Sequence, residues 1–152
     1  MNDVAQRLTV PDLALRCLDG TQVNPADLRG QNLVIFFCPR DPSAAALEIE
    51  EFSGLAARFV DAGVWLLGVL QGPLPPRLAK ERYPHIELAE DLDGRAWAWL
   101  EPALRGHGTP DRSAGAAFFF ERCGSLRKAW PSSGHARDVL GAATSWADRA
   151  DR

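Results

Sequence analysis

The stretch from Leu33 to Glu51 constrains this chain most strongly. An apolar run from Leu33 to Cys38 stops at Pro39, and a turn of polar and small residues follows before a helical pattern begins at Ala44. A run without polar alternation is typical of a central strand that is covered on both faces. Where such a strand leads into a helix, unpaired backbone N–H groups attract anions and reactive side chains. We therefore expect the functional site at this junction.

Short apolar runs alternate with helical patterns along the rest of the chain. Strands are expected at residues 13–17, 21–23, 64–70, 86–88, 116–121 and 125–130, and helices at 44–62, 94–100 and 134–150, with a further helix from residue 75 or 76 to 83. Asp93 is positioned to cap the helix at 94–100, and residues 101–114 form the least regular segment. This order predicts an α/β fold with a central mixed sheet, helices on both faces and an N-terminal β-hairpin.

Length and composition narrow the functional classes. The 152 residues fit one domain, expected at 9–147 between flexible termini at 1–8 and 148–152. A net charge of −3 gives no electrostatic case for nucleic acid or an acidic membrane surface, and no apolar run is long enough to span a bilayer. The three cysteines contain no C-x-x-C pair, which suits a reducing, cytoplasmic location. The three histidines share no ligand spacing with them, so neither a metal nor a cofactor is expected.

Four short motifs follow one another in a familiar order. They are Pro11-Asp12-Leu13 with Leu18-Asp19-Gly20, then Asp27-Leu28-Arg29-Gly30, then Phe36-Phe37-Cys38-Pro39-Arg40-Asp41, and finally Phe118-Phe119-Phe120-Glu121 with Gly124. In this order and spacing the chain resembles the peroxiredoxins of the AhpC/TSA family, and among them the bacterioferritin-comigratory type. The resemblance implies a thioredoxin-like fold and, by ancestry, a thiol peroxidase.

The resemblance also implies a site whose nucleophile is absent from this chain. The family motif is P-x-x-x-T/S-x-x-C, and Pro39 and Ser43 match its first two fixed positions. The hydroxyl of Ser43 fits an N-cap or turn role equally well. The peroxidatic cysteine, which attacks a peroxide as a thiolate at a helix N-terminus, has its position at Ala46. The common position of the resolving cysteine, five residues later, is Glu51.

An arginine that stabilises the thiolate and the polarised peroxide precedes the late strand in the family. Its position falls at Gly115 when the late strand and its hairpin set the register. Arg112 lies three residues earlier and can reach the site only if this loop bends differently. The residues that keep the appearance of the family's active-site turn are Pro39, Arg40, Asp41 and Ser43.

Cys38 is the best surviving candidate for a reactive thiol, because it ends the central strand immediately before Pro39. Nothing near it in the sequence obviously lowers a thiol pKa, so packing as a small buried apolar residue is the favoured interpretation. Cys123 falls at the tip of a hairpin and is expected to be exposed, whereas Cys17 fits packing in an early strand.

Other chemistry-bearing side chains have ordinary structural interpretations. Glu48 and Glu50 are expected on the solvated face of the helix at 44–62. His107, in a glycine-rich segment, fits a lone surface histidine better than a general base. The indoles expected to pack in the core are Trp97, Trp99 and Trp130.

Two functional hypotheses follow. In the first, the protein keeps the family fold with a degenerate active site and has a non-peroxidase role, binding a protein partner or a small ligand as a monomer or dimer. In the second, it is a weak or non-canonical thiol peroxidase that uses Cys38 beside Ser43 and a thiol reductant such as thioredoxin. Peroxide consumption by the wild type and by a Cys38→Ser variant separates the two.

Overall fold

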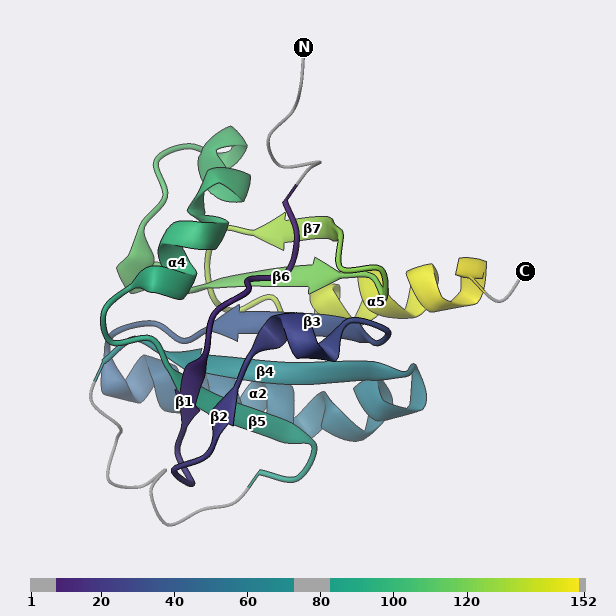
Figure 1. Ribbon diagram of the computed structural model, residues 1–152, viewed down its shortest axis with the longest axis horizontal. Helices are drawn as coiled ribbons and strands as arrows, with labels where there is room; N and C mark the ends of the chain where they lie inside the picture. Colours follow the sequence, from purple (N-terminus) through teal and green to yellow (C-terminus); the bar gives the residue numbers. More distant parts are fainter. Residues whose placement is uncertain (1–7, 73–82, 151–152) are drawn as a thin grey trace.

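The computed structural model describes residues 8–72 and 83–150 (Figure 1). The helix expected from residue 75 or 76 to 83 lies almost wholly outside the described residues, as do most of the N-terminal segment and the last two residues that were expected to be flexible. Within the described part of the chain, no helix is long and apolar enough to cross a membrane.

A seven-stranded mixed sheet forms the centre of the molecule, with the strands in the order β2-β1-β5-β4-β3-β6-β7. Strands β3, β4 and β5 are parallel, and the remaining pairs are antiparallel. The strands are β1 (Leu15–Cys17), β2 (Gln22–Val23), β3 (Asn32–Phe37), β4 (Val64–Leu70), β5 (Ile86–Glu90), β6 (Ala116–Phe120) and β7 (Leu126–Trp130). The predicted mixed sheet and N-terminal hairpin are confirmed.

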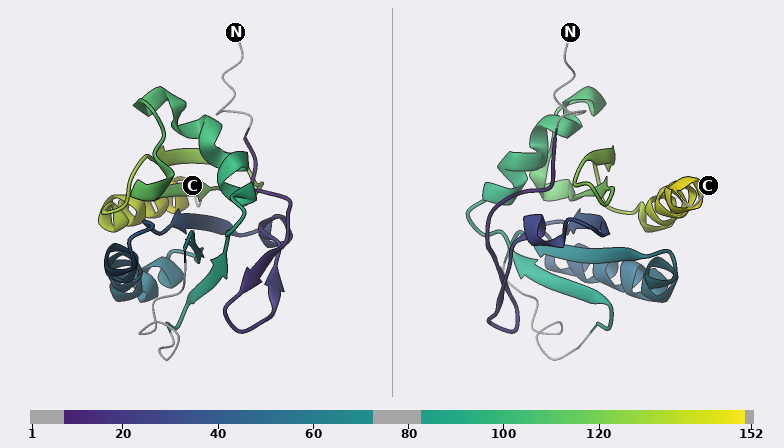
Figure 2. Two further views of the ribbon diagram at one scale, coloured as in Figure 1. Left: turned by 90° about the vertical axis from the view of Figure 1, so that its left-hand side faces the viewer. Right: turned by 45° about the vertical axis from the view of Figure 1, so that its right-hand side comes forward.

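Helices cover both faces of this sheet (Figure 2). On one face α2 (Pro42–Asp61) and α5 (Ala136–Ala150) pack side by side, with α2 against β4 and α5 against β6. On the other face α4 (Arg95–Leu100) and the 3-10 helix Glu101–His107 pack with the N-terminal strands. The remaining short 3-10 helices are Pro25–Leu28 and Arg112–Ala114. The segment at 101–114, expected to be irregular, therefore contains two helical turns.

The aromatic side chains of β3 fix the position of α2. Phe36 stacks on Phe52 of the helix with their ring centroids 4.0 Å apart. The ring of Phe36 also lies where a side chain on β4 would be, since a Cβ added to Gly68 would lie 2.7 Å from it. Gly68 is needed for this close approach, which lets the Phe36 ring lie between β4 and α2.

Strand β4 is less buried than its sequence predicts. Its residues after Trp65 are buried, but Trp65 itself is 52% exposed. Trp65 is the second residue of the strand, and strand alternation places it on the face of Leu67 and Val69, opposite the face covered by α2. The expectation of a fully buried strand at 64–70 is therefore wrong at this one position.

The helix caps differ from those predicted. Helix α2 begins at Pro42, two residues earlier than expected, and its N-cap is Asp41, whose carboxylate accepts a hydrogen bond from Ala44 N at 2.9 Å. Ser43 lies inside the first turn, so of the two structural roles considered for it, an N-cap or a turn residue, it does not have the first. The N-cap position of α4 is a glycine, and Asp93 accepts only a long 3.3 Å hydrogen bond from the backbone of Arg95.

Candidate functional site

Four segments converge at the carboxyl ends of the parallel strands. They are Cys38–Ser43 after β3, Gln71 after β4, Asp91 after β5, and Arg112–Gly115 before β6. Ligand sites of α/β sheets form at this edge, because the loops that leave neighbouring parallel strands meet there. We call this group the turn edge.

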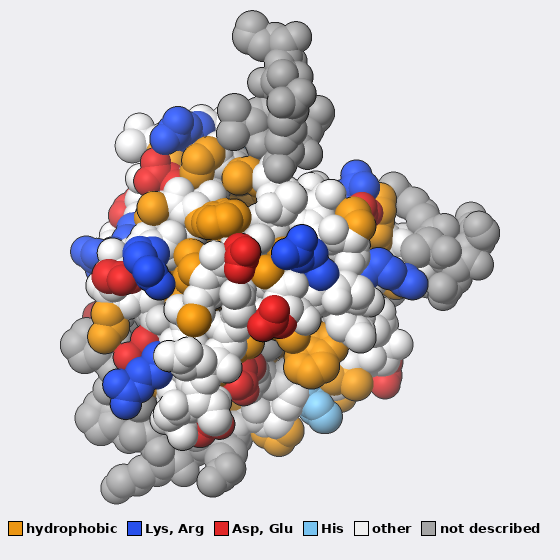
Figure 3. Space-filling model, viewed as in Figure 1, with side chains coloured by type: hydrophobic (Ala, Val, Ile, Leu, Met, Phe, Trp, Pro, Cys, Tyr) orange, Lys and Arg blue, Asp and Glu red, His pale blue; other side chains and the backbone are white. Residues whose placement is uncertain are grey.

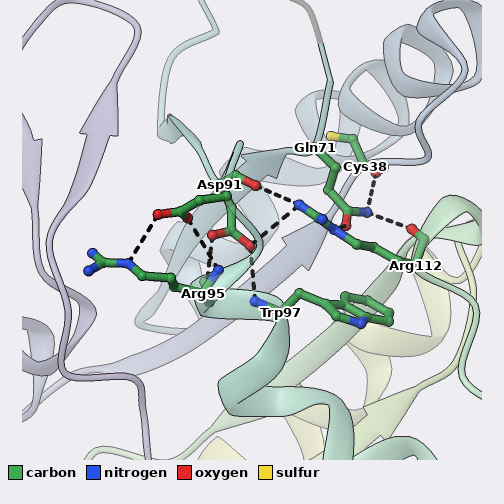
Figure 4. A network of polar contacts seen from close by, with 8 residues as sticks. Cys38, Gln71, Asp91, Arg95, Trp97 and Arg112 are labelled. Carbon is green, nitrogen blue, oxygen red and sulfur yellow. Dashed lines mark hydrogen bonds and ion pairs between the residues drawn. The ribbon is translucent and has the colours of Figure 1, made fainter.

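A buried amide joins three of these segments (Figure 4). Gln71 Nε2 donates hydrogen bonds to Cys38 O at 2.9 Å and to Arg112 O at 2.7 Å, and Gln71 Oε1 accepts one from Arg112 Nε at 2.6 Å. Gln71 is only 6% exposed. Because three of its hydrogen-bonding positions are filled, the side chain ties the end of β3 to the loop before β6.

The Asp91 carboxylate, 1% exposed, is the second centre of this network. Its two oxygens accept hydrogen bonds from Ala96 N and Trp97 N, both at 3.0 Å, so Asp91 caps α4 in place of the predicted Asp93. Arg112 Nη2 donates to the backbone oxygen of Asp91 at 2.6 Å and lies 4.0 Å from its carboxylate. A buried carboxylate is stable when it is paired in this way.

Arg112 is therefore committed to protein partners. Its guanidinium is held between Gln71 and Asp91 (Figure 4) and lies against Gly94, where an added Cβ would be 2.8 Å from Nη1. The loop does bring Arg112 to the turn edge, but its nitrogens point to these groups. An arginine that stabilises a reacting anion needs free N–H donors, and at least two of these donors are already used.

Gly115, to which the sequence register assigned the family's arginine, has no room for a side chain. Its φ is +80°, a conformation that strongly favours glycine, and an added Cβ would lie 2.6 Å from Phe37 O and 3.3 Å from Pro39. The buried Gly115 thus packs its α-carbon directly on the end of β3. Any larger residue here would have to move the backbone of the turn.

Ala46 lies in the first turns of α2 and is 9% exposed. In this helix the positive N-terminal end is already met by an anion of the chain itself, the Asp41 carboxylate. Ser43 and Arg40 are exposed, and Arg40 N donates a hydrogen bond to Ser113 O at 3.2 Å. The turn residues named from the sequence, Pro39 to Ser43, thus lie at the start of α2, and the side chain at position 46 is a methyl group.

The described cysteines expose no sulfur at the turn edge. Cys38 is fully buried, and burial followed by the charge of Glu48 raises the pKa of its thiol far above the ordinary range. Burial also raises the pKa of Cys17 to about 11, helped by its hydrogen bond with Glu87. The complete burial of Cys38 and its raised pKa favour its interpretation as a packed apolar residue.

The exposed thiol, Cys123, lies at the other end of the sheet. It belongs to the hairpin after β6, and because β6 runs antiparallel to β3, this hairpin lies beside the start of β3. The thiol donates to Glu121 Oε1 at 2.6 Å and lies 3.3 Å from Ser125 Oγ. Its exposure at a hairpin tip agrees with the sequence, and its distance from the turn removes it from any chemistry there.

Glu48 is a residue that sequence reasoning misplaced. It is 3% exposed, not solvated, and Gly134 N donates to its carboxylate at 3.2 Å. Burial raises its pKa, and Glu51 adds to the shift. The error arose because α5, which covers this side of α2, is distant in the sequence. Trp97 and Trp130 are buried as expected, whereas Trp99 is 36% exposed.

Gln71 and Asp91 were missed altogether. Each follows an apolar strand directly, and polar residues at the ends of neighbouring parallel strands are the signal that could have identified them. Among the described residues, no group of three or more histidine, cysteine or acidic side chains is arranged to hold a metal ion.

The sheet order and the turn edge define a peroxiredoxin-like protein of the thioredoxin fold, and the comparisons with known proteins agree. The model of the AhpC/TSA family matches residues 7–85, which is more than half of the chain, and the chain belongs to this family. No curated protein matches it.

Solved structures of the same class are similar over nearly the whole chain. A Xanthomonas campestris peroxiredoxin Q structure is 25% identical with a TM-score of 0.72, covering 91% of this chain and 94% of its own. The Xanthomonas campestris bacterioferritin comigratory protein, in a study of its alkyl peroxide reduction activity, is 25% identical with a TM-score of 0.71, covering 90% and 91%. The exposed lipoprotein thioredoxin Etrx1 of Streptococcus pneumoniae is 17% identical with a TM-score of 0.63, covering 88% and 98%, and shows the fold alone.

Proposed function

We propose that this member of the AhpC/TSA family has a degenerate active site and a non-peroxidase role, binding a partner through the turn edge. The observation that carries the proposal is the methyl group of Ala46 at the start of α2, at an edge where no described cysteine exposes its sulfur. Peroxide reduction by the family's route begins with a thiolate, and a methyl group supplies none.

The electrostatics of the turn edge support the same conclusion. Asp41 occupies the helix N-terminus, Arg112 is paired within the network, and Gly115 leaves no room for a replacement arginine. Removing one preorganised donor from a transition state costs about 3–4 kcal/mol. Here the nucleophile and its electrostatic support are absent together, so residual peroxide chemistry at this edge would be slow.

Exposed apolar side chains flank the turn edge and suit a protein partner. Leu47, one turn into α2, and Leu92, directly after Asp91, are each 61% exposed. Exposed leucines beside a rigid polar network can form a contact surface for another protein. Burying each side chain would contribute about 1.5–3 kcal/mol to the free energy of binding. A small ligand is the other candidate for the same edge.

The second candidate function is a weak thiol peroxidase that uses Cys38 and a thiol reductant such as thioredoxin. Its support is the place of Cys38 at the end of β3, where Gln71 holds its carbonyl oxygen at the turn edge. The complete burial of the sulfur and its raised pKa oppose this candidate.

The test is hydrogen peroxide and alkyl hydroperoxide consumption with thioredoxin or dithiothreitol as reductant. The wild type, Cys38→Ser and Cys123→Ser variants are compared, with an active peroxiredoxin as the assay control. We expect none of the three proteins to exceed the uncatalysed rate. Turnover by the wild type that disappears in Cys38→Ser would overturn the non-peroxidase proposal. Turnover that disappears only in Cys123→Ser would overturn it too, and would move the chemistry to the hairpin.

A further inference from the structure

A hollow lies at the end of the sheet opposite the turn edge. It is formed by the starts of β4 and β5 and by the last turn of α2. Its volume is about 400 Å³, within the range of roughly 300–1,000 Å³ that is usual for small-molecule sites. The residues that line it are Gln31, Val60, Gly63, Val64, Trp65, Leu66, His85, Ile86 and Glu87. We refer to it as the Trp65 hollow.

We propose that the Trp65 hollow binds a small organic cation, a quaternary or alkylammonium group. The proposal goes beyond the function suggested for the turn edge and does not rest on it. Neither Ala46 nor Arg112 lines the hollow.

An exposed indole provides the binding surface. Trp65 is 52% exposed although it belongs to a central strand. Val60, at the end of α2, is 46% exposed and lines the same hollow. A hydrophobic area next to a histidine is visible on this face of the molecule (Figure 3). The face of a tryptophan ring is the aromatic surface that attracts cations most strongly.

An acid lies on the same face of the sheet as the indole. Glu87 pairs with Leu67 of β4, two residues from Trp65, so Glu87 and Trp65 project from the same side of the sheet. Val60, in the last turn of α2, and Gly63 also line the hollow, although α2 itself packs on the opposite face. The indole and the carboxylate together favour a cation.

A buried acceptor without a partner lies beside the hollow. Asn32 is 5% exposed, and its side-chain oxygen has no hydrogen-bond partner among the described residues. It lines an adjoining hollow of about 330 Å³ that shares Gln31 and Gly63 with the first. Arg122 lines this adjoining hollow together with Asn32. Neither residue lines the Trp65 hollow, so the unpaired oxygen of Asn32 belongs to the neighbouring hollow and not to the proposed cation site.

The backbone at the entrance supports a binding role. His85 has a φ of +70°, and it is the non-glycine residue with a positive φ in the described part of the chain. Such a conformation costs of order 1–3 kcal/mol, and residues held in it cluster at active sites and ligand-binding segments. Here it turns the chain into β5 with the exposed His85 at the rim of the hollow.

The experiment titrates the full chain with choline chloride and, separately, with the uncharged carbon isostere of choline, while amide and indole N–H correlation spectra are recorded. We expect choline to produce saturable shifts at millimolar concentration in the Trp65 indole signal and in the amides of His85 and Glu87. The isostere should produce none. No saturable shift with choline would overturn the proposal, and equal shifts with both compounds would overturn the choice of a cation.

Variants separate recognition from folding. Trp65→Leu keeps an apolar side chain and should weaken choline binding about tenfold. Glu87→Gln should weaken it less and reduce its dependence on salt. Trp99→Leu removes another partly exposed indole, which bonds Thr9 O and does not line the hollow, and should leave binding unchanged. Equal weakening by Trp65→Leu and Trp99→Leu, with the rest of the spectrum preserved, would contradict the assignment of the site.

Discussion

The two ends of the parallel strands carry similar side chains in opposite states. At the turn edge the buried amide of Gln71 and the carboxylate of Asp91 are fully engaged, and Arg112 joins them. At the opposite edge the buried oxygen of Asn32 has no partner among the described residues, and Trp65 is half exposed. Buried polar groups are stable only when they are paired. We call the turn edge closed, because its buried polar groups are paired within the protein. We call the opposite edge open, because the Asn32 oxygen lacks a partner among the described residues and Trp65 is half exposed.

The pairing at the turn edge supports the proposal that Arg112 is not a substitute for the arginine of the family. An arginine can serve a reacting anion only with donors that the protein leaves free. Arg112 instead supplies the contacts that hold three loops together. The turn edge has become a structural junction, and its stability should be much more sensitive to substitution than that of the opposite edge.

The largest effect is expected at Gly115. Gly115→Ala should lower the free energy of unfolding by about 3–4 kcal/mol, because a Cβ would meet Phe37 O in a backbone conformation that disfavours alanine. Gly20→Ala is the matched control, since its φ is +90° and nothing lies within 4 Å of the added atom. That change should cost only about 1 kcal/mol. Urea unfolding measures both, and equal losses would show that the turn edge is not closed at this point.

Asp91→Ala should cost about 3 kcal/mol, because two backbone N–H groups of α4 and the Arg112 guanidinium lose a buried acceptor. Asp93→Ala removes an exposed ion pair with Arg95 and should change stability by no more than about 0.5 kcal/mol. Chemical denaturation of both variants gives the comparison. A loss from Asp91→Ala as small as that from Asp93→Ala would show that the network contributes little.

At the opposite edge we expect a substitution that increases stability. Asn32→Leu should raise the free energy of unfolding by about 1 kcal/mol, because the apolar side chain of similar shape removes a buried oxygen that lacks a partner. The same denaturation experiment measures the gain. A loss of stability would mean that this oxygen is hydrogen-bonded in solution, and the contrast between the two edges would then fail.

A thiol placed at Ala46 tests whether the helix N-terminus is available to an anion. In Ala46→Cys we expect a thiol pKa near the ordinary value of about 8.5, because the Asp41 carboxylate offsets the helix dipole. Adding Asp41→Asn should lower that pKa by about half a unit. The pH dependence of alkylation by iodoacetamide, measured in a Cys123→Ser background, reports both values. A markedly depressed pKa in the first variant would show that an activating pocket survives.

The smallest effect concerns Glu48. Burial raises its pKa in the folded state, so the folded protein keeps this proton to a higher pH than the unfolded chain does. The stability that this proton contributes is present below the unfolded pKa and is lost as the pH rises through the folded pKa. Glu48→Gln should therefore gain stability relative to the wild type as the pH rises from 4 to 7. Thermal unfolding across that range checks the sign, and a constant difference between the proteins would contradict it.

Much of the fold followed from local patterns. The apolar runs at β3, β4 and β6 identified the centre of the sheet because strands covered on both faces need apolar residues at every position. The motifs around Pro39 and Phe118 placed the chain in its family. The order of elements could be predicted because each run was bounded by glycine, proline or a short polar turn.

The candidate site was predicted only in part. The register of the motif assigned Ala46 and Gly115 to the family's cysteine and arginine positions directly from the sequence, and that assignment stays a prediction. The network of Gln71, Asp91 and Arg112 was not visible, because its members are separated by 20 or more residues, as the sequence shows. The N-cap of α2 was not predicted either, because the carboxylate that caps it belongs to Asp41, three residues before the expected start of the helix.

Sequence alone determined the family, the mixed sheet and the absence of a cysteine at position 46, because these depend on local periodicity and motif spacing. Tertiary structure decided which polar groups are paired and which tryptophan faces solvent. Those properties depend on what packs against each side chain from distant segments. The closed turn edge and the open Trp65 hollow are therefore features of the folded chain that no single stretch of its sequence contains.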